Sequence, residues 1–195
     1  MSSSLIVNMN NDFPVFKTSR LLLRQITEGD LENIFRGLSD PEVIKYYGVS
    51  FDTLNETKKQ IEWFAELEKD ETGIWWAICS PDNLMFYGAV GLYYLNSEYK
   101  KAEIGFWLIP EYWRRGIISE SILLVIEYGF EIMHLNKIEA EVETENIFSK
   151  RVMQKLNFVH ELTKKDCEIK NGKYISLDVY TRVCLKPSST VDEKF

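Results

Sequence analysis

The chain has little cysteine and histidine, no excess of positive charge and no long apolar run, and each shortage excludes a class of protein. Cys79, Cys167 and Cys184 are widely spaced, and neither they nor the two histidines have metal-ligand spacing. A disulfide framework and a metal site are therefore not expected. Because 23 Lys and Arg stand against 30 Asp and Glu, the net charge of −7 argues against a nucleic-acid partner. No run approaches the ~18 apolar residues of a membrane span, so we expect no membrane contact and a reducing, cytoplasmic location.

Length and composition indicate one folded domain. At ~150 residues per domain, a chain of 195 residues with a hydrophobic fraction of 45% predicts a single domain with its own core. The Ser- and Asn-rich start has neither the positive end nor the apolar stretch of a signal peptide. We therefore expect a flexible extension over residues 1–17, the domain over 18–184 and a flexible tail over 185–195.

The pattern of apolar residues predicts a mixed α/β (α+β) fold. Leu31, Ile34, Phe35 and Leu38 have the spacing of an amphipathic helix, and Asn-Gly at 171–172 between two strand-like runs predicts a hairpin. Short gaps between the three middle strands favour a central, mostly antiparallel, twisted sheet flanked by helices. The expected elements are strand 20–26, helix 31–38, a second helix capped by Asn55, strands 74–79, 84–95 and 102–109, helix 116–134, strand 137–142, helix 146–156, and strands 158–168 and 174–183.

The segment 102–120 carries the clearest chemical signal. A strand runs into a loop that contains Arg114 and Arg115, and Gly116 then opens a long helix. The unpaired N–H groups and partial positive charge of a helix start bind phosphates, and the two arginines add positive charge locally. The chain has no GxxxxGK[ST] and no GxGxxG, which excludes a P-loop and a dinucleotide-binding turn. By themselves, these three residues also fit a solvated helix start.

Five segments, taken together and in order, are more specific than any one of them. They are Thr18–Arg24, Ala102–Trp107, Trp113–Glu120, Asn146–Phe158 and Asn171–Tyr180. Over residues 18–183 the chain thereby resembles the GCN5-related N-acetyltransferase (GNAT) superfamily, and more narrowly its ribosomal-protein, RimJ/RimL-like branch. The resemblance implies the GNAT fold, an N-acetyltransferase activity and acetyl-CoA as the co-substrate.

The resemblance also implies which residues bind acetyl-CoA. The main chain of Phe106, Trp107 and Leu108 matches the strand that binds the pantetheine arm. Asn146, which by position is also a helix N-cap, and Ser149 match residues that lie along this arm and near its thiol. The residues that match the pyrophosphate loop are Arg114, Arg115, Gly116, Ile117, Ile118 and Ser119.

Three side chains are candidates for proton transfer. Ser149 is the candidate acid for the departing thiolate, because Met153 stands where some relatives have a tyrosine acid. Glu141 and Glu103 are the candidate bases, and Glu141 ranks first because it matches the catalytic glutamate of alanine-specific relatives. Alternate residues of a strand share a face, so the glutamates of 139–143 also fit a solvated sheet face. The two candidate carboxylates could instead serve only to attract a cationic amine.

The expected reaction is direct attack of an amine on the thioester, because Cys79 and Cys184 have no partner that would activate them as nucleophiles. A protein N-terminal α-amine is the favoured acceptor, by resemblance only. At pH 7 an α-amine (pKa ~8) costs about 1.4 kcal/mol to deprotonate and a lysine (pKa ~10.4) about 4.6 kcal/mol. The alternatives are a small-molecule amine, such as an aminoglycoside or a polyamine, and a non-catalytic acyl-CoA-binding sensor. The sequence is compatible with a monomer or a homodimer.

Overall fold

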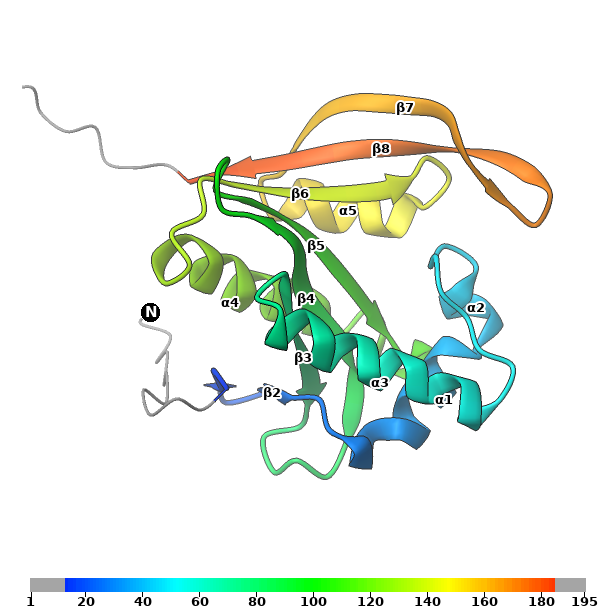
Figure 1. Cartoon of the computed structure of the whole chain (residues 1–195), viewed down its shortest axis with the longest axis vertical. Coiled ribbons are helices and arrows are strands. Elements are labelled where there is room, and N and C mark those ends of the chain that lie inside the picture. The colour runs from blue at the N-terminus through cyan, green and yellow to red at the C-terminus, as the bar shows by residue number, and fades with distance from the viewer. Residues whose placement is uncertain (1–12, 185–195) are drawn as a thin grey trace, which may run out of the picture.

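The computed structural model describes residues 13–184 and confirms a mixed α/β domain built on one eight-stranded sheet (Figure 1). The parts of the expected extension and tail at 1–12 and 185–195 lie outside the described residues. In chain order the elements are β1 (Phe16–Lys17), β2 (Leu22–Gln25), the 3₁₀ turn η1 (Glu28–Asp30), α1 (Leu31–Leu38), α2 (Pro41–Ile44), α3 (Leu54–Lys69), β3 (Gly73–Cys79), β4 (Phe86–Asn96), β5 (Lys101–Leu108), the 3₁₀ turn η2 (Pro110–Tyr112), α4 (Ile117–Glu131), β6 (Lys137–Glu143), α5 (Ile147–Lys155), β7 (Val159–Lys170) and β8 (Lys173–Val183).

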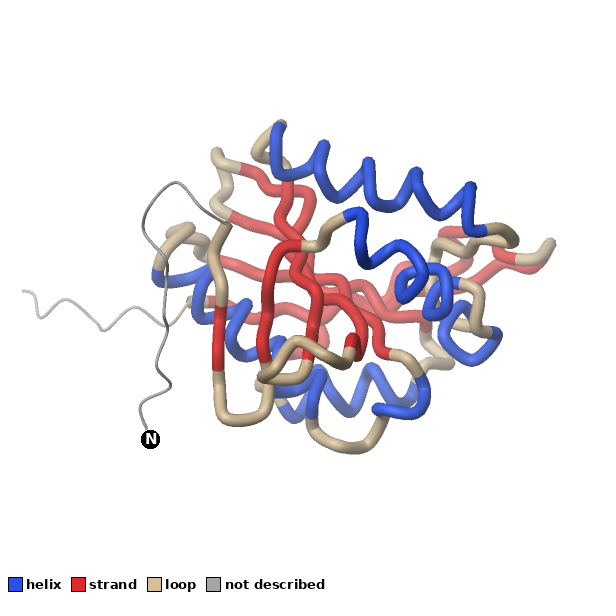
Figure 2. Tube along the Cα trace, turned by 90° about the horizontal axis from the view of Figure 1, so that it is seen from below, coloured by secondary structure: helices blue, strands red, loops and turns tan. Residues whose placement is uncertain are grey.

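Helices cover both faces of the sheet (Figure 2). A Cβ added to Gly37 of α1 would lie 2.0 Å from Trp107 of β5, so α1 packs closely on the face to which Trp107 points. A Cβ added to Gly129 of α4 would lie 3.1 Å from Leu92 of β4, whose partner on β5 is Ile104. Because Ile104 and Trp107 are three residues apart on one strand, they point to opposite faces. Helices α1 and α4 therefore lie on opposite faces of the sheet.

The sheet, ordered β1-β2-β3-β4-β5-β6-β8-β7, splits between β5 and β6. β5 and β6 run parallel and pair only where Lys101–Glu103 meets Lys137–Glu139. Beyond that point β5 stays paired with β4 up to Leu108, and β6 stays paired with β8 up to Glu143. The two strands separate in Figure 1, and within the described sheet the β6-facing main chain of residues 104–108 has no strand partner.

The domain begins earlier than the sequence predicts. Phe16 and Lys17 fall in the expected flexible extension, yet they form β1 and pair with Leu23 and Leu22. The Phe16 side chain is 1% exposed and packs against Trp76, which explains why this short segment is ordered. A two-residue strand has no periodicity that a sequence pattern could reveal, because its place is set by tertiary packing.

Helix ends were predicted with mixed success. Asn55 is not the cap of α3: Thr53 is, and its side chain accepts a hydrogen bond from the Glu56 N–H at 3.2 Å. Thr53 and Asn55 are both common N-cap residues, so the sequence alone favours neither. The expected cap at Asn146 is confirmed, and Asn157, which follows α5, adopts the left-handed conformation at φ 59°. The predicted hairpin is confirmed as β7 and β8, joined at Asn171-Gly172.

The close contact between α1 and Trp107 gives a stability prediction. Replacing Gly37 by alanine should lower the free energy of unfolding by about 2 kcal/mol. The steric overlap of the new methyl group with the Trp107 indole costs more free energy than the higher helix propensity of alanine contributes. Urea unfolding of the variant measures the change. The matched control is Gly48→Ala, where an added Cβ meets nothing within 4 Å. Equal stability of the two variants would contradict the close packing of α1.

Candidate active site

The loop between β5 and α4 has the backbone geometry of an anion-binding helix start. Arg114 and Gly116 both adopt the left-handed conformation, at φ 61° and 76°, and α4 begins at Ile117. Gly116 makes no side-chain cap hydrogen bond, so the N–H groups of Ile117–Ser119 are the free donors of an uncapped helix start. A Cβ added to Gly116 would meet only Arg20 Nη1, at 4.0 Å, so the space above this turn is open. The loop can therefore receive a phosphate close to its main chain.

Residues near the N-terminus hold this loop in place. Arg20 donates from Nη2 to the Arg115 carbonyl at 2.6 Å, and its Nη1 lies 3.3 Å from the Glu120 carboxylate. Thr18 donates from Oγ1 to the same carboxylate at 2.7 Å. These contacts join the segment before β2 to the first turn of α4. They give a physical role to Thr18–Arg24, which the sequence singled out without assigning it one.

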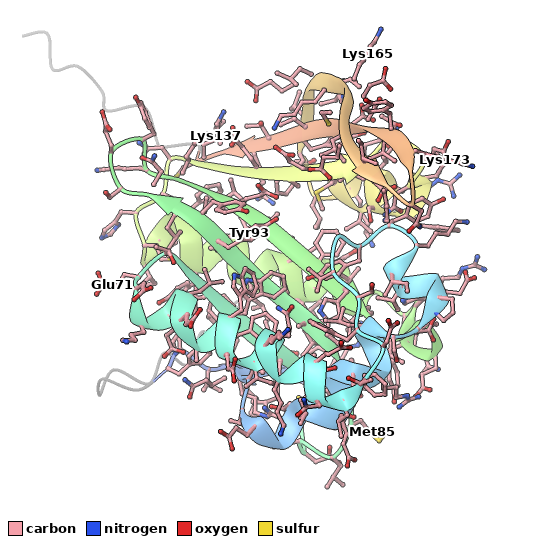
Figure 3. All side chains as sticks on the ribbon, turned by 45° about the vertical axis from the view of Figure 1, so that its right-hand side comes forward. Glu71, Met85, Tyr93, Lys137, Lys165 and Lys173 are labelled. Atoms are coloured by element: carbon pink, nitrogen blue, oxygen red, sulfur yellow. The ribbon has the colours of Figure 1, made fainter. Side chains whose placement is uncertain are left out.

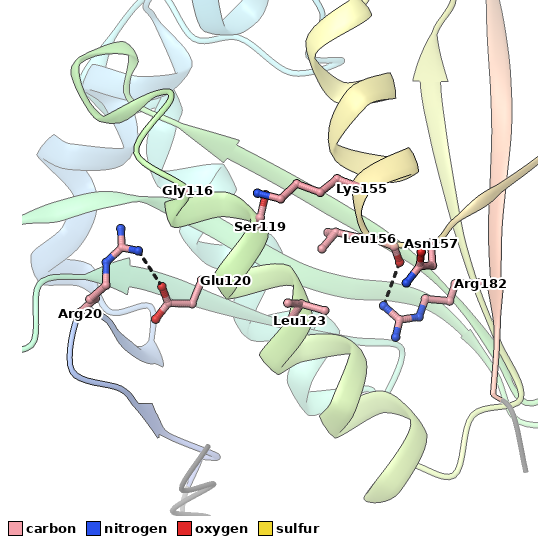
Figure 4. Close-up of a pocket in the computed structure, with 9 residues that line it drawn as sticks. All are labelled: Arg20, Gly116, Ser119, Glu120, Leu123, Lys155, Leu156, Asn157 and Arg182. Atoms are coloured by element: carbon pink, nitrogen blue, oxygen red, sulfur yellow. Dashed lines mark hydrogen bonds and ion pairs between the residues drawn. The ribbon is translucent and has the colours of Figure 1, made fainter. Parts of the chain in front are cut away.

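A groove of about 430 Å³ lies beside the first turns of α4 and the end of α5 (Figure 4). Gly116 and Ser119, which were predicted to bind the co-substrate, line this groove together with three basic side chains that were not predicted as site residues, Arg20, Lys155 and Arg182. Arg20 belongs to the Thr18–Arg24 segment, whereas Lys155 of α5 and Arg182 of β8 lie far from it in the sequence, so no single local motif connects the three. The lining residues are Arg20, Gly116, Ser119, Glu120, Leu123, Lys155, Leu156, Asn157 and Arg182. Since Arg20 already pairs with Glu120, the groove has a net positive lining that suits an anion.

The start of α5 approaches the same loop from across the split sheet. The Asn146 side chain accepts a hydrogen bond from the Ser149 N–H at 3.1 Å, which fixes the first turn of the helix. The guanidinium of Arg114 lies 5.7 Å from the ring centre of Phe148, which is itself 58% exposed. Ser149 is half-buried. The loop at Arg114 and the start of α5 at Phe148, both predicted to contribute to the site, therefore lie next to each other.

The predicted β5 residues can offer mainly their main chain. Trp107 and Leu108 are 4% and 6% exposed, and their side chains belong to the core. Phe106 is half-buried and packs against the same core. Because β5 has parted from β6 here, this main chain has no strand partner on the side of the split, although the Leu108 carbonyl already accepts a hydrogen bond from Trp113 Nε1 at 2.8 Å. This arrangement suits a ligand that binds like a neighbouring strand.

Glu103 occupies the last paired position before the split. It lies opposite Glu139 of β6 and opposite Tyr93 of β4, whose hydroxyl donates a hydrogen bond to its Oε1. Burial raises the pKa of Glu103 to about 7, against the opposing effect of the Tyr93 hydrogen bond, and the charge of Glu141 adds to the rise. A half-buried carboxyl of this pKa can take up and release a proton at neutral pH.

Glu141, by contrast, is engaged in an ion pair. Lys164 of β7 donates to its Oε1, and this hydrogen bond raises the pKa of the Lys164 ammonium. The neighbouring glutamates are also paired, Glu139 with Lys101 at 3.1 Å and Glu143 with Lys170 at 2.5 Å. The predicted common face of these glutamates is confirmed by the alternating burial of β6. It is a row of half-buried ion pairs rather than a freely solvated face.

The described residues also bear on metals, cysteines and membranes. Among residues 13–184, no group of three or more His, Cys, Asp and Glu side chains is arranged to hold a metal ion. Burial raises the pKa of Cys79 to about 11, so its thiol is a poor nucleophile at neutral pH. No helix in this range is long and apolar enough to span a membrane.

Two proteins of known sequence are similar to this chain over most of its length. The chain is 38% identical to the Bacillus subtilis protein named uncharacterized N-acetyltransferase YoaA, over 88% of this chain and 97% of that protein. It is 24% identical to the ribosomal-protein-serine acetyltransferase of Escherichia coli, over 66% and 70% of the two chains.

Two solved structures show the same fold at low sequence identity. The ribosomal L7/L12 α-N-protein acetyltransferase RimL, in complex with coenzyme A, superposes with a TM-score of 0.77 at 20% identity, covering 85% of this chain and 95% of that one. The spermidine N-acetyltransferase of Vibrio cholerae, in complex with CoA and spermine, gives 0.76 at 22% identity over 85% and 96%. The acetyltransferase (GNAT) domain family matches residues 20–159, well over half of the chain. With this match and the 38% identical relative, the chain belongs to the GNAT family and is an acetyl-CoA-dependent N-acetyltransferase.

Proposed function

We propose that the protein transfers the acetyl group of acetyl-CoA directly to a protein N-terminal α-amine, as a cytoplasmic enzyme. The proposal rests on Glu103. Its carboxyl has a pKa of about 7, and the residue lies where β5 and β6 part. A base is most effective when its pKa is near the working pH. We therefore favour Glu103 over Glu141, whose carboxylate is occupied by Lys164.

The proposed co-substrate site combines three parts of the chain. The pyrophosphate would bind the amides from Arg114 to Ser119, and the pantetheine arm would run between the free edge of Phe106–Leu108 and the start of α5 at Asn146. The basic groove with Lys155 lies next to this loop and would receive the remaining phosphate of CoA. Phosphates favour such sites because helix-start amides and basic side chains both stabilise negative charge.

The proposed reaction needs no covalent acetyl-enzyme. Glu103 accepts a proton from the protonated amine, directly or through water, and the neutral nitrogen attacks the thioester carbonyl. The C–N bond forms, and the C–S bond breaks when the tetrahedral intermediate collapses. As the intermediate collapses, its ammonium nitrogen loses a second proton to solvent, and the departing thiolate takes a proton from Ser149, which regains one from solvent. Glu103 then releases its own proton to solvent and is ready for the next turnover. The products are the acetylated amine and CoA.

An α-amine is easier to deprotonate than a more basic acceptor, and a base with the pKa of Glu103 is sufficient for this smaller cost. Proton transfer from an α-ammonium (pKa ~8) to a base of pKa about 7 is uphill by about 1.4 kcal/mol, against about 4.6 kcal/mol from an alkyl ammonium of pKa ~10.4. A polyamine is the second candidate, because a spermidine acetyltransferase shares the fold. The lysines paired with Glu139, Glu141 and Glu143 leave little unpaired negative charge for a polycation.

An acceptor screen tests the proposed function. Purified protein and acetyl-CoA are incubated with N-terminal peptides, polyamines, aminoglycosides and ε-amino lysine peptides, and thiol release is followed. We expect turnover with peptides that have a free α-amine and none with the same peptides blocked at the N-terminus. Preferential turnover of polyamines or aminoglycosides would refute the proposed acceptor. Tight acetyl-CoA binding without turnover of any amine would favour a sensor.

Ser149 gives a second test of the mechanism. Ser149→Ala should lower kcat roughly 10–100-fold, because a positioned acid for the leaving group is lost. The affinity for acetyl-CoA, measured by calorimetry, should stay nearly unchanged, since the Asn146 side chain bonds to the main chain of Ser149. Ser97→Ala, in the exposed turn between β4 and β5, is the control. Full activity of Ser149→Ala would exclude Ser149 as the acid.

A further inference from the structure

The Tyr93 side chain makes a hydrogen bond to Glu103. Among residues 13–184 it makes none to any other carboxylate. The two residues lie directly opposite each other in the β4–β5 register, and the Tyr93 hydroxyl donates to Glu103 Oε1. Burial raises the pKa of Tyr93 far above neutrality, so its hydroxyl stays protonated and remains a donor wherever Glu103 titrates. The donor is therefore permanent, and only the acceptor changes its charge.

The ring of Tyr93 is fixed by its neighbours on the α3 side of the sheet (Figure 3). Its centroid lies 5.9 Å from Trp75 of β3, 6.2 Å from Trp63 of α3 and 4.7 Å from Tyr94. Aromatic pairs at these separations are attractive and directional, so the ring cannot turn away from Glu103 without losing several contacts.

Two glycines make this arrangement possible. A Cβ added to Gly91 would lie 2.3 Å from Trp75 Cγ, and one added to Gly105 would lie 2.8 Å from Trp75 Cη2. The indole therefore lies flat across β4 and β5. Gly105 is two residues from Glu103, on the same face of β5, and its added Cβ would also lie 3.1 Å from a ring carbon of Tyr93. The aromatic stack thus extends to the edge of the candidate base.

The hydrogen bond leaves one oxygen of Glu103 uncommitted. Within residues 13–184, hydrogen bonds from protein donors reach Oε1 alone. The charged and titratable groups that influence this carboxyl come from several elements. They are Tyr93 of β4, Glu139 and Glu141 of β6 and Lys164 of β7, with Tyr47 and Tyr94 acting on Tyr93 itself. Of these, Tyr93 makes the direct hydrogen bond to Glu103, and it has the largest effect that favours the ionised form.

We propose that Tyr93 is a positioning residue of the reaction, an inference that rests on the proposed role of Glu103 as the base. It holds Oε1 and orients the carboxylate so that Oε2 is left to accept the proton of the acceptor amine. It also offsets the effect of burial, because a donor to the ionised form lowers the pKa of a carboxyl. Without it, Glu103 would be mostly protonated, and inactive as a base, at neutral pH.

The test is Tyr93→Phe, which keeps the ring and removes only the hydroxyl. The acidic limb of the kcat profile should move up by about one pH unit, since a hydrogen bond to a charged group is lost. Because the ionised fraction of Glu103 at pH 7 would fall from about one half to about one tenth, activity should drop about 5-fold at pH 7 and recover by about pH 9. Wild type and variant are assayed with the same saturating peptide, so the titration of the amine cancels. Tyr94→Phe is the matched control, because Tyr94 is 72% exposed, and its profile should not move.

A second measurement needs no turnover. Carbon-13 NMR of the labelled Glu103 carboxyl in the full chain follows its titration in wild type and in Tyr93→Phe. An upward shift of its pKa in the variant supports the proposal. An unchanged pKa, or an equal loss of activity at every pH, shows that Tyr93 only packs, and overturns it. If Glu103→Gln keeps full activity, the proposed base role of Glu103 is wrong. That failure can be told apart from a failure of the Tyr93 proposal, because the NMR titration measures the effect of Tyr93 on the Glu103 carboxyl without any turnover.

Discussion

Replacing Glu103 by glutamine should lower kcat at pH 7 by about 10²–10³-fold, the range expected when a positioned general base is lost. The wild-type rate should rise as pH increases through about 7, because Glu103 acts as a base only when ionised. Glutamine does not titrate, so the variant should lose that limb of the profile. Its residual rate should follow the neutral fraction of the amine alone. Initial rates from pH 5.5 to 9.5 with one saturating peptide measure both effects.

Glu141→Gln is the comparison that separates the two candidate bases. In the wild type the Glu141 carboxylate is hydrogen-bonded to Lys164. We therefore expect a smaller loss of kcat in Glu141→Gln and a pH–rate profile that keeps its acidic limb. The opposite pattern, with the limb lost in Glu141→Gln and kept in Glu103→Gln, would assign the base role to Glu141.

The Glu103→Gln variant should not lose activity through unfolding. The folded-state pKa of about 7 lies above the unfolded value of ~4.3. The folded protein therefore binds the proton more tightly, and the contribution of Glu103 to stability is present below pH ~4 and lost as pH rises to about 7. Removing a carboxyl that is unfavourably ionised at pH 8 should leave the variant at least as stable as wild type there. Urea midpoints at pH 5 and pH 8 check this sign.

Replacing Gly116 by aspartate should raise the KM for acetyl-CoA about 10–100-fold, because a negative charge a few ångströms from a pyrophosphate is repelled. The position is solvent-open, so the new side chain has room. The kcat at saturating acetyl-CoA should change little, since the reacting groups lie elsewhere.

Gly116→Asn is the matched control for this variant. Asparagine has nearly the size of aspartate and also tolerates the left-handed conformation that φ 76° requires, so it imposes the same backbone strain without the charge. A rise in KM of only a few fold is expected for it. Equal effects of the two substitutions would show that conformation, and not charge, is what residue 116 contributes.

Local features of the fold could be predicted from the sequence, and long-range ones could not. The periodicity of Leu31–Leu38 predicts α1, and Asn171-Gly172 predicts the β7–β8 hairpin, because both signals depend on neighbours in the chain. The split between β5 and β6 has no local signal. It depends on where a parallel pairing stops, which is set by the twist and packing of the whole sheet.

The same distinction applies to the site. The loop at Arg114–Gly116 is contiguous and could be recognised. Arg182 reaches the groove from the end of β8, and Lys164 reaches Glu141 from β7, so both contacts exist only after the hairpin has folded back. The sequence also ranked Glu141 above Glu103. The burial and the Tyr93 hydrogen bond that distinguish Glu103 come from other strands and cannot be deduced from its own neighbours.

The split also divides the sheet into two groups of strands that share few hydrogen bonds with each other. One part, β1 to β5, and the other, β6, β8 and β7, are joined by the short β5–β6 pairing and by helices such as α4. The proposed contacts to acetyl-CoA come from both parts, Phe106–Leu108 on one side and Ser149 on the other. A molecule bound to both restrains their relative motion, so amide exchange along the facing edges should slow when acetyl-CoA binds. If the proposed contacts form, we expect acetyl-CoA to bind before the amine, because it would join the two parts of the sheet that form the site.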